Sequence, residues 1–326
     1  MQDDIVRMVS EKQVEMRGNM NDKKKVFLAD CALFLAAICW GGGFIAGDIA
    51  VNYFSTFYIL TIRFLAAALV TFLFFSRTIR RSTKAEIKYG LILGIFFFLA
   101  MPLQVIALKY TTPSKQAFLL AGYAAMVPFF SWIILKKRPE TRAFFAGTLV
   151  LIGIGLISLN GSLSIELGDG LSLGFSVAYA IFVVLTGIFA GKCNPIGMSF
   201  FSYLATGVFS LIAALLFGDF PPSFPMRGVL ALAYLATVST AVAFTLQNVA
   251  QKFTSDAHAA ILLSLESLFG FIFGVFLYGD PFTLRTLIGG LIVFSAVIIT
   301  EINWKKQSKP GEATQTDIQN TESIEL

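Results

Sequence analysis

The sequence has 326 residues, of which 56% are hydrophobic and only 14% are charged, with a mean hydropathy of +0.75 and a formal net charge of +5. A soluble domain carries about a quarter charged residues, so this composition excludes an ordinary soluble protein and indicates a chain that resides in a bilayer. Backbone polar groups must be paired inside the hydrocarbon core, so apolar runs of about 20 residues predict membrane-spanning helices. The alternating pattern of a membrane β-barrel is absent from the sequence.

The chain begins with a polar segment of mixed charge, residues 1–26, which contains Lys23, Lys24 and Lys25 next to the first long apolar run. A cleavable signal would have a short apolar core and a cleavage site of small residues, whereas here one long apolar run is followed by another. We therefore expect this segment to stay on the protein and to lie in the cytoplasm.

Ten apolar runs follow, separated by short breaks rich in charged residues, Pro, Gly or Asn. They predict membrane-spanning helices at 27–47, 55–76, 86–108, 113–135, 141–160, 168–190, 195–217, 227–250, 257–278 and 283–303. Short connections make consecutive helices antiparallel neighbours. The predicted fold is an all-α integral membrane protein, followed by a polar tail, residues 305–326, that is expected to be disordered and cytoplasmic.

The basic residues predict the orientation of these helices. With a cytoplasmic N-terminus, 20 Lys and Arg residues fall on the inner side and 4 on the outer side, and Arg63 lies inside a span. Positive charge concentrates on the cytoplasmic side of membrane proteins, so both termini are predicted to be inside, in the inner (plasma) membrane of a bacterial-type cell. The net charge is accounted for by topology, and no nucleic-acid partner is expected.

One helix junction occurs twice. The sequence "LQVIALKYTTPSKQAFLL" at 103–120 is matched 143 residues later by "LQNVAQKFTSDAHAAILL" at 246–263. Five spans separate the copies, and this odd number turns the second copy upside down in the membrane. Residues 27–160 and 168–303 are therefore predicted to form two inverted five-helix repeats. Such repeats are typical of transporters, with a substrate site near the bilayer midplane and alternating access.

Five segments in order carry a family resemblance: "CWGGGFIAGDIA" (39–50), "TIRFLAAALV" (61–70), "ALKYTTPSKQAFLL" (107–120), "LLSLESLFGFIFGVFLYGD" (262–280) and "LIGGLIVFSAVII" (287–299). Together they resemble the drug/metabolite transporter superfamily, specifically its ten-helix EamA-type exporters. The resemblance implies secondary transport of small metabolites, usually outward, with substrates that vary widely among relatives. The chain departs from the family in having Ser267 where relatives often have Pro after Leu-Glu.

Glu266 is the one acidic residue well inside a predicted span, where an ionised side chain costs about 2.5–3.5 kcal/mol. It is either a cavity-facing group that binds a proton or cation and couples transport, or a neutral carboxyl bonded to a neighbouring helix. Arg63 also lies within a span, and a structural role is favoured for it because its side chain can reach headgroups or carbonyls. Asp48 is expected to be a solvated carboxylate at the outer end of its span.

The remaining cavity candidates are polar or aromatic residues within the spans. Gln104 and Gln247 are the repeated pair at equivalent depth, and each either binds substrate or bridges helices. Aromatic candidates are Trp40, Phe44, Tyr123 and Tyr179, although aromatic residues also fill any membrane bundle. Gly43 belongs to a run of three glycines that allows close approach of a helix or a ligand, and helix packing is favoured as its role.

Nothing in the sequence predicts catalysis, a metal or a cofactor. There is a single His, the three Cys residues lack metal-ligand spacing, and a phosphate-binding Gly-Lys-Ser/Thr loop is missing. We expect a secondary active exporter of a small organic metabolite, such as an amino acid or a related amphiphile, with protons or a counter-substrate as driving partner. The alternatives are an uptake or exchange carrier on the same fold, a channel, and a membrane-embedded enzyme or lipid-handling protein.

Overall fold

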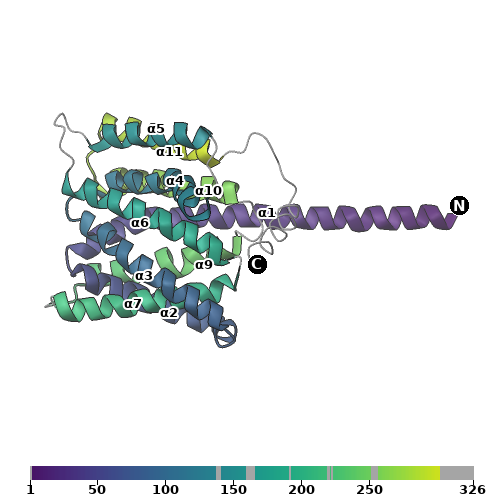
Figure 1. Ribbon diagram of the computed structural model, residues 1–326, viewed down its shortest axis with the longest axis horizontal. Helices are drawn as coiled ribbons and strands as arrows, with labels where there is room; N and C mark the ends of the chain where they lie inside the picture. Colours follow the sequence, from purple (N-terminus) through teal and green to yellow (C-terminus); the bar gives the residue numbers. More distant parts are fainter. Residues whose placement is uncertain are drawn as a thin grey trace.

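The computed structural model describes residues 2–136, 141–158, 166–190, 192–218, 221, 223–250 and 256–301. All regular elements in these ranges are helices, which lie alongside one another in a bundle (Figure 1). In chain order they are α1 (Gln2–Val51), α2 (Thr56–Ile79), α3 (Lys84–Ala107), α4 (Pro113–Leu135), α5 (Thr141–Ser158), α6 (Leu167–Ala190), α7 (Pro195–Phe217), α8 (Met226–Tyr234), η1 (Leu235–Val242), α9 (Ala243–Ala250), α10 (Asp256–Ile272), η2 (Phe273–Tyr278) and α11 (Leu284–Glu301).

Each predicted span falls on a helix over nearly all of its described residues. Seven helices among the described residues are long and apolar enough to cross a bilayer, and three further apolar helices are shorter, at Phe144–Ile157, Leu262–Tyr278 and Leu284–Ala296. The all-α membrane architecture is thus confirmed, while the count of ten spans stays a prediction. Helix α1 begins at Gln2 instead of near residue 27, so the polar N-terminal segment continues the helix of the first span and projects beyond the bundle (Figure 1). The predicted tail, residues 305–326, lies outside the described residues.

Two of the predicted spans contain a change in helix type that the sequence did not predict. The span at 227–250 consists of α8, the π-helix η1 and α9, and the span at 257–278 consists of α10 and the π-helix η2. In a π-helix each N–H bonds to the carbonyl five residues earlier, which widens the turn and occurs frequently at functional sites. The π-helix η1 therefore alters which face of α9 points into the bundle, whereas η2 ends its span.

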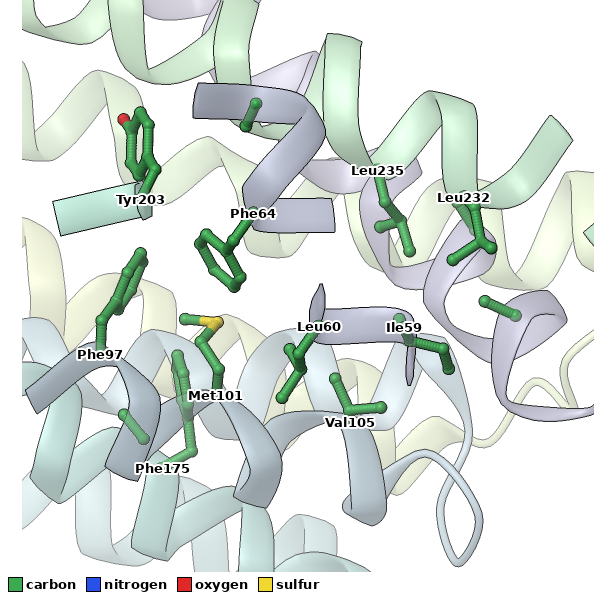
Figure 2. Close-up of a cluster of buried hydrophobic side chains, with 14 of the residues drawn as sticks. Ile59, Leu60, Phe64, Phe97, Met101, Val105, Phe175, Tyr203, Leu232 and Leu235 are labelled. Carbon is green, nitrogen blue, oxygen red and sulfur yellow. The ribbon is translucent and has the colours of Figure 1, made fainter. Parts of the chain in front are cut away.

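The main helix contacts join the first five predicted spans to the last five. Helix α2 packs against α7, α3 against α6 and α7, α5 against α11, α1 against α10, and α4 against α6. In the largest core, Phe64 of α2 lies between Phe97 of α3 and Tyr203 of α7 (Figure 2), with ring centroids 5.2 and 6.3 Å away. This packing places residues from distant parts of the chain around one central region.

The bundle is apolar on its outside and holds polar groups inside. Phe74 and Phe217 are each 79% exposed, whereas Ser176 and Thr206 are fully buried. The hydroxyls of these two residues are paired, since Ser176 Oγ donates to the Leu119 carbonyl at 3.0 Å and Thr206 Oγ1 donates to the Ser202 carbonyl at 2.8 Å. An exposed apolar surface of this kind suits lipid.

Candidate functional site

A cavity lies in the centre of the bundle, between α1, α2, α3, α4, α6, η1, α9 and α10. Its volume, counted as space for the centre of a water-sized sphere, is about 60 Å³. Because about 10–15 Å³ of such volume holds one water, the cavity in this conformation has room for a small organic molecule. The lining residues are Trp40, Gly43, Phe44, Arg63, Met101, Gln104, Leu120, Tyr123, Phe175, Tyr179, Ser239, Phe244 and Glu266.

Arg63 of α2 is the cationic residue of the lining, and it is 8% exposed. Its Nε donates a hydrogen bond to Thr240 Oγ1 of η1 at 2.9 Å, and its guanidinium carbon lies 5.5 Å from the centre of the Phe64 ring. Thr240 Oγ1 donates in turn to the Leu235 carbonyl at 2.8 Å, across one turn of the π-helix. No carboxylate among the described residues forms an ion pair with Arg63.

Glu266 of α10 is the acidic residue of the lining. Within the described part of the chain, its carboxylate has neither a hydrogen-bond donor nor an ion-pair partner. Tyr179 of α6 lines the same cavity as Glu266 and Arg63. The cavity thus contains one basic and one acidic side chain, carried by helices from different halves of the chain and not paired with each other among the described residues.

Aromatic rings form much of the wall. Tyr123 and Tyr179 meet edge to face with ring centroids 4.8 Å apart, and Phe175 stacks on Tyr179 at 5.1 Å. Trp40 packs edge to face on Phe244 at 4.9 Å. The wall therefore offers ring faces to the apolar or cationic part of a ligand.

The three glycines of α1 lie where neighbouring helices come closest. A Cβ on Gly41 would lie 2.5 Å from Phe269 Cβ, and a Cβ on Gly43 would lie 2.6 Å from Ser239 Oγ. A Cβ on Gly42 would collide with the hydroxyl of Tyr234, which donates a hydrogen bond to the Cys39 carbonyl at 3.0 Å. These contacts fit the close helix packing that the sequence favoured, and Gly43 also lines the cavity.

The repeated glutamines differ in position. Gln104 lines the cavity. Its backbone carbonyl oxygen accepts a hydrogen bond from Gln116 Nε2 at 2.8 Å, whereas its side-chain Oε1 is buried without a hydrogen-bond partner among the described residues. Gln247 is not among the lining residues. Of the sequence candidates, Trp40, Gly43, Phe44, Gln104, Tyr123, Tyr179 and Glu266 are brought together at the cavity, and Gln247 is not.

The structure adds residues that sequence reasoning passed over: Met101, Leu120, Phe175, Ser239 and Phe244, together with Arg63, for which a structural role was favoured. The apolar residues among them could not be identified as cavity residues from the sequence, because apolar residues occur throughout every span. A charged side chain within a span was the one signal that could have placed Arg63 in the site.

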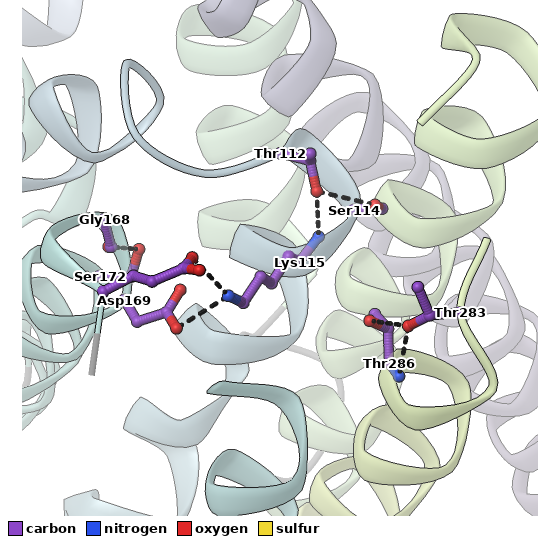
Figure 3. A network of polar contacts seen from close by, with 9 residues as sticks. Thr112, Ser114, Lys115, Gly168, Asp169, Ser172, Thr283 and Thr286 are labelled. Atoms are coloured by element: carbon purple, nitrogen blue, oxygen red, sulfur yellow. Dashed lines mark hydrogen bonds and ion pairs between the residues drawn. The ribbon is translucent and has the colours of Figure 1, made fainter. Parts of the chain in front are cut away.

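A second set of polar contacts lies at one end of the bundle, and we call it the end cluster: Asp48, Ser114, Lys115, Glu166, Asp169, Tyr278 and Asp280. Lys115 Nζ of α4 lies 2.8 Å from Asp169 Oδ2 of α6 and 3.1 Å from Glu166 Oε2 (Figure 3). The Ser114 N–H donates to Asp280 Oδ2 at 2.8 Å, and the Tyr278 hydroxyl donates to Asp48 Oδ2. Asp48 was expected to be solvated, but it joins α1 to η2.

Among the described residues, no group of three or more His, Cys, Asp or Glu residues could hold a metal ion. Cys31, Cys39 and Cys193 are free thiols.

Comparison with known proteins gives a consistent match. The EamA-like transporter family matches residues 27–159 and again residues 166–302. An uncharacterized transporter of Archaeoglobus fulgidus is 27% identical over 289 residues, which cover 89% of this chain and 90% of that protein. The uncharacterized transporter YyaM of Bacillus subtilis is 28% identical over 294 residues, which cover 83% of this chain and 95% of that protein.

A solved crystal structure is also similar, with a TM-score of 0.61 and 17% sequence identity, over 83% of this chain and 95% of that chain. At this identity the likeness shows the fold alone.

Proposed function

The chain belongs to the EamA-like transporter family and is a multi-pass membrane transporter, and from this premise we propose that it exports a small organic metabolite, an amino acid or a related amphiphile, by alternating access. The observation that carries this proposal is the central cavity, which is lined by both halves of the chain and contains Arg63 and Glu266 without a carboxylate or cationic partner among the described residues. Charged groups inside a membrane bundle are costly and typically mark a substrate or ion pathway.

The helix contacts support two equivalent halves, 27–160 and 168–303. In chain order, α1 to α7 correspond to predicted spans 1 to 7, α8–η1–α9 to span 8, α10–η2 to span 9 and α11 to span 10. When each span is exchanged for its counterpart five spans away, the α1–α10 contact becomes the α6–α4 contact, and the α3–α6 contact becomes the α9–α1 contact. All four contacts are present. The α2–α7 and α5–α11 contacts map onto themselves. This is the pattern of a two-fold relationship, and an odd number of spans per half makes it an inverted one. This pattern supports the proposal of ten spans in two inverted repeats, with a substrate site near the midplane between them.

The end cluster supports a gate. It joins α1 and α4 of the first half to α6, η2 and the start of the η2–α11 connection in the second half. In the proposed topology these residues lie at the outer end, with both termini in the cytoplasm of an inner-membrane protein. The described conformation is then closed towards the outside, and export requires these contacts to separate.

Glu266 is the proposed coupling group. It faces the cavity, and a carboxylate there can take up and release a proton if water reaches it from each side in turn. Proton entry through this group would drive export of the metabolite, with a counter-substrate as the alternative driving partner.

The test begins with metabolite profiling of cells with and without the protein, which identifies the exported solute. Purified protein in liposomes should then show saturable counterflow of that solute, as expected for a carrier. Flux without stimulation by solute on the opposite side would indicate a channel and contradict the proposal. Net accumulation of the solute inside cells would indicate uptake instead of export.

A further inference from the structure

A second cavity opens at the opposite end of the bundle from the end cluster, where α2 ends and where α3 and α7 begin. Its volume, counted in the same way as that of the central cavity, is about 280 Å³. The lining residues are all polar, and we call this cavity the arginine pocket: Arg77, Thr78, Arg81, Glu86 and Asn194. Its lining suits a polar, charged group, unlike the aromatic wall of the central cavity.

The acidic residue of the arginine pocket is already held by the protein. Glu86 is buried, and its Oε1 accepts a hydrogen bond from Thr83 Oγ1 at 3.1 Å in the first turn of α3. Its Oε2 lies against the first turn of α7, where a Cβ on Gly197 would collide with it. The positive end of a helix dipole favours a carboxylate at both places. The charge of Glu86 is therefore compensated within the fold, which leaves the arginines to a ligand.

The arginines of the pocket have no such partner. Arg77 lies in the last turn of α2 and Arg81 follows that helix, and neither side chain forms an ion pair or a hydrogen bond among the described residues. Asn194 Oδ1 accepts a hydrogen bond from the Ile196 N–H at 3.0 Å, so its Nδ2 group is left as a donor. Two guanidinium groups, this amide and the Thr78 hydroxyl thus share one space. Positively charged and amide donors of this kind bind the oxygens of a phosphate group.

The arginine pocket lies where the apolar surface of the bundle ends. Leu73 and Phe74 are exposed on α2 one turn before Arg77, and Ile87 and Leu91 are exposed on α3. In a bilayer such a surface faces acyl chains, and the basic side chains beyond it reach the level of the lipid headgroups. A phospholipid can therefore place its phosphate in the pocket and its acyl chains along α2 and α3, whereas a soluble phosphate compound contacts only the pocket.

We propose that the arginine pocket binds the headgroup phosphate of an anionic phospholipid. The ammonium group of a zwitterionic phospholipid would lie close to two arginines, so an anionic headgroup is preferred. In the proposed orientation the pocket faces the cytoplasmic leaflet, whose anionic lipids attract basic groups. The bound lipid contacts α2 and α3 of the first half and Asn194 at the start of α7 in the second half. This site shares no lining residue with the central cavity.

Lipids with the same acyl chains test the proposal on the purified full-length protein in a nonionic detergent. Dioleoyl phosphatidylglycerol and dioleoyl phosphatidylcholine are titrated separately, and binding is measured by thermal stabilisation and by the lipid retained in native mass spectrometry. Phosphatidylglycerol should bind about tenfold more tightly or better, because the choline group meets like charge in the pocket. Inorganic phosphate and glycerol 3-phosphate, at the same concentrations, should not displace it. Equal binding of the two lipids, or displacement of phosphatidylglycerol by glycerol 3-phosphate, overturns the proposal.

Variants locate the lipid site. Arg77→Gln combined with Arg81→Gln should weaken phosphatidylglycerol binding by about tenfold or more, because two charge-assisted contacts are lost. The matched control combines Arg80→Gln with Lys84→Gln, which removes two exposed charges at the same end of the bundle but outside the pocket, and it should keep close to the parental affinity.

Monodisperse elution in size-exclusion chromatography establishes that each variant is folded, and Arg81→Gln alone replaces the double variant if that protein fails this check. Equal losses of affinity in the pocket variant and the control would show general attraction to surface charge and overturn the proposal. Parental affinity in a folded pocket variant overturns it as well.

Discussion

The indole Nε1 of Trp40 donates a hydrogen bond to the backbone carbonyl oxygen of Ser239 at 2.8 Å, and both residues line the central cavity. Trp40 belongs to α1 and Ser239 to the π-helix η1, so this bond crosses between the two halves of the chain. Since its one donor is used in this way, Trp40 contributes its ring face and its position to the cavity.

Replacing a wall residue should impair transport more than replacing a residue that faces lipid. Trp40→Ala removes both the Ser239 bond and the contact with Phe244, and Tyr123→Ala removes the edge-to-face contact with Tyr179. The matched control is Phe74→Ala, because Phe74 is 79% exposed on the outside of the bundle. Counterflow at equal membrane expression is the measurement. Similar losses in all three variants would indicate packing damage and contradict a cavity role.

A methyl group on the glycine run should destabilise the α1–α10 contact. In Gly41→Ala the new Cβ would lie 2.5 Å from Phe269 Cβ and 3.0 Å from the Gly270 backbone N, and backbone cannot move aside as a flexible side chain can. Overpacking of this kind costs about 1–3 kcal/mol, so the midpoint of thermal unfolding in detergent should fall. Gly170→Ala is the control, since a Cβ there meets nothing within 4 Å, and it should be neutral or stabilising. An unchanged midpoint for Gly41→Ala would show that α1 can shift freely.

Single cysteines should report the proposed topology. Thr141 and Ser223 are both exposed, and the charge distribution predicts that they lie on opposite sides of the membrane. In a background without Cys31, Cys39 and Cys193, a membrane-impermeant maleimide applied to intact cells should label Ser223→Cys and spare Thr141→Cys. Labelling of both positions from outside would remove the inverted-repeat argument.

Loss of the Lys115 charge should open the end cluster. Asp169 is fully buried, so Lys115→Met leaves its carboxylate without this cation, and breaking a buried ion pair costs about 3–5 kcal/mol. This cost destabilises the conformation described here, so the population shifts towards a conformation that is open at this end of the bundle. Labelling of a Ser239→Cys cavity probe by an impermeant reagent from outside should therefore speed up. Lys109→Met, at an exposed lysine on the connection between α3 and α4, should leave the labelling rate unchanged.

The variant Glu266→Gln should lose the coupling of transport to proton movement while it keeps the ability to bind and exchange the substrate. Gln keeps the shape and a hydrogen-bonding oxygen but cannot titrate, so transport driven by a pH gradient should fall steeply. Counterflow should continue, because exchange of substrate for substrate requires no net movement of protons. Parental rates of pH-driven transport in this variant would assign Glu266 a structural role and move the coupling to substrate exchange.

The positions of the helices could be predicted from the sequence because residues close in the chain determine where each helix begins and ends. The junction at Thr112-Pro113 is an example: Thr112 Oγ1 accepts a hydrogen bond from the Lys115 N–H at 3.3 Å, and Pro113 occupies the first turn of α4, as the break after Lys109 predicted. Apolar runs and their polar breaks placed every predicted span on a helix. The polar-tipped aromatics and Glu266 were candidates because buried polar groups are costly wherever the fold places them.

Which residues meet at the site was decided by tertiary structure alone. In a membrane bundle the lipid-facing and core-facing sides are equally apolar, so the sequence does not mark the inward face of a helix as it does in a soluble protein. Gln104 and Gln247 have equivalent places in the repeat, but the π-helix η1 precedes Gln247 and shifts the face of the residues after it, while the matching part of α3 is α-helical. The side chains of Arg63 and Glu266 likewise line one cavity only because α2 and α10, about two hundred residues apart in the chain, enclose it together.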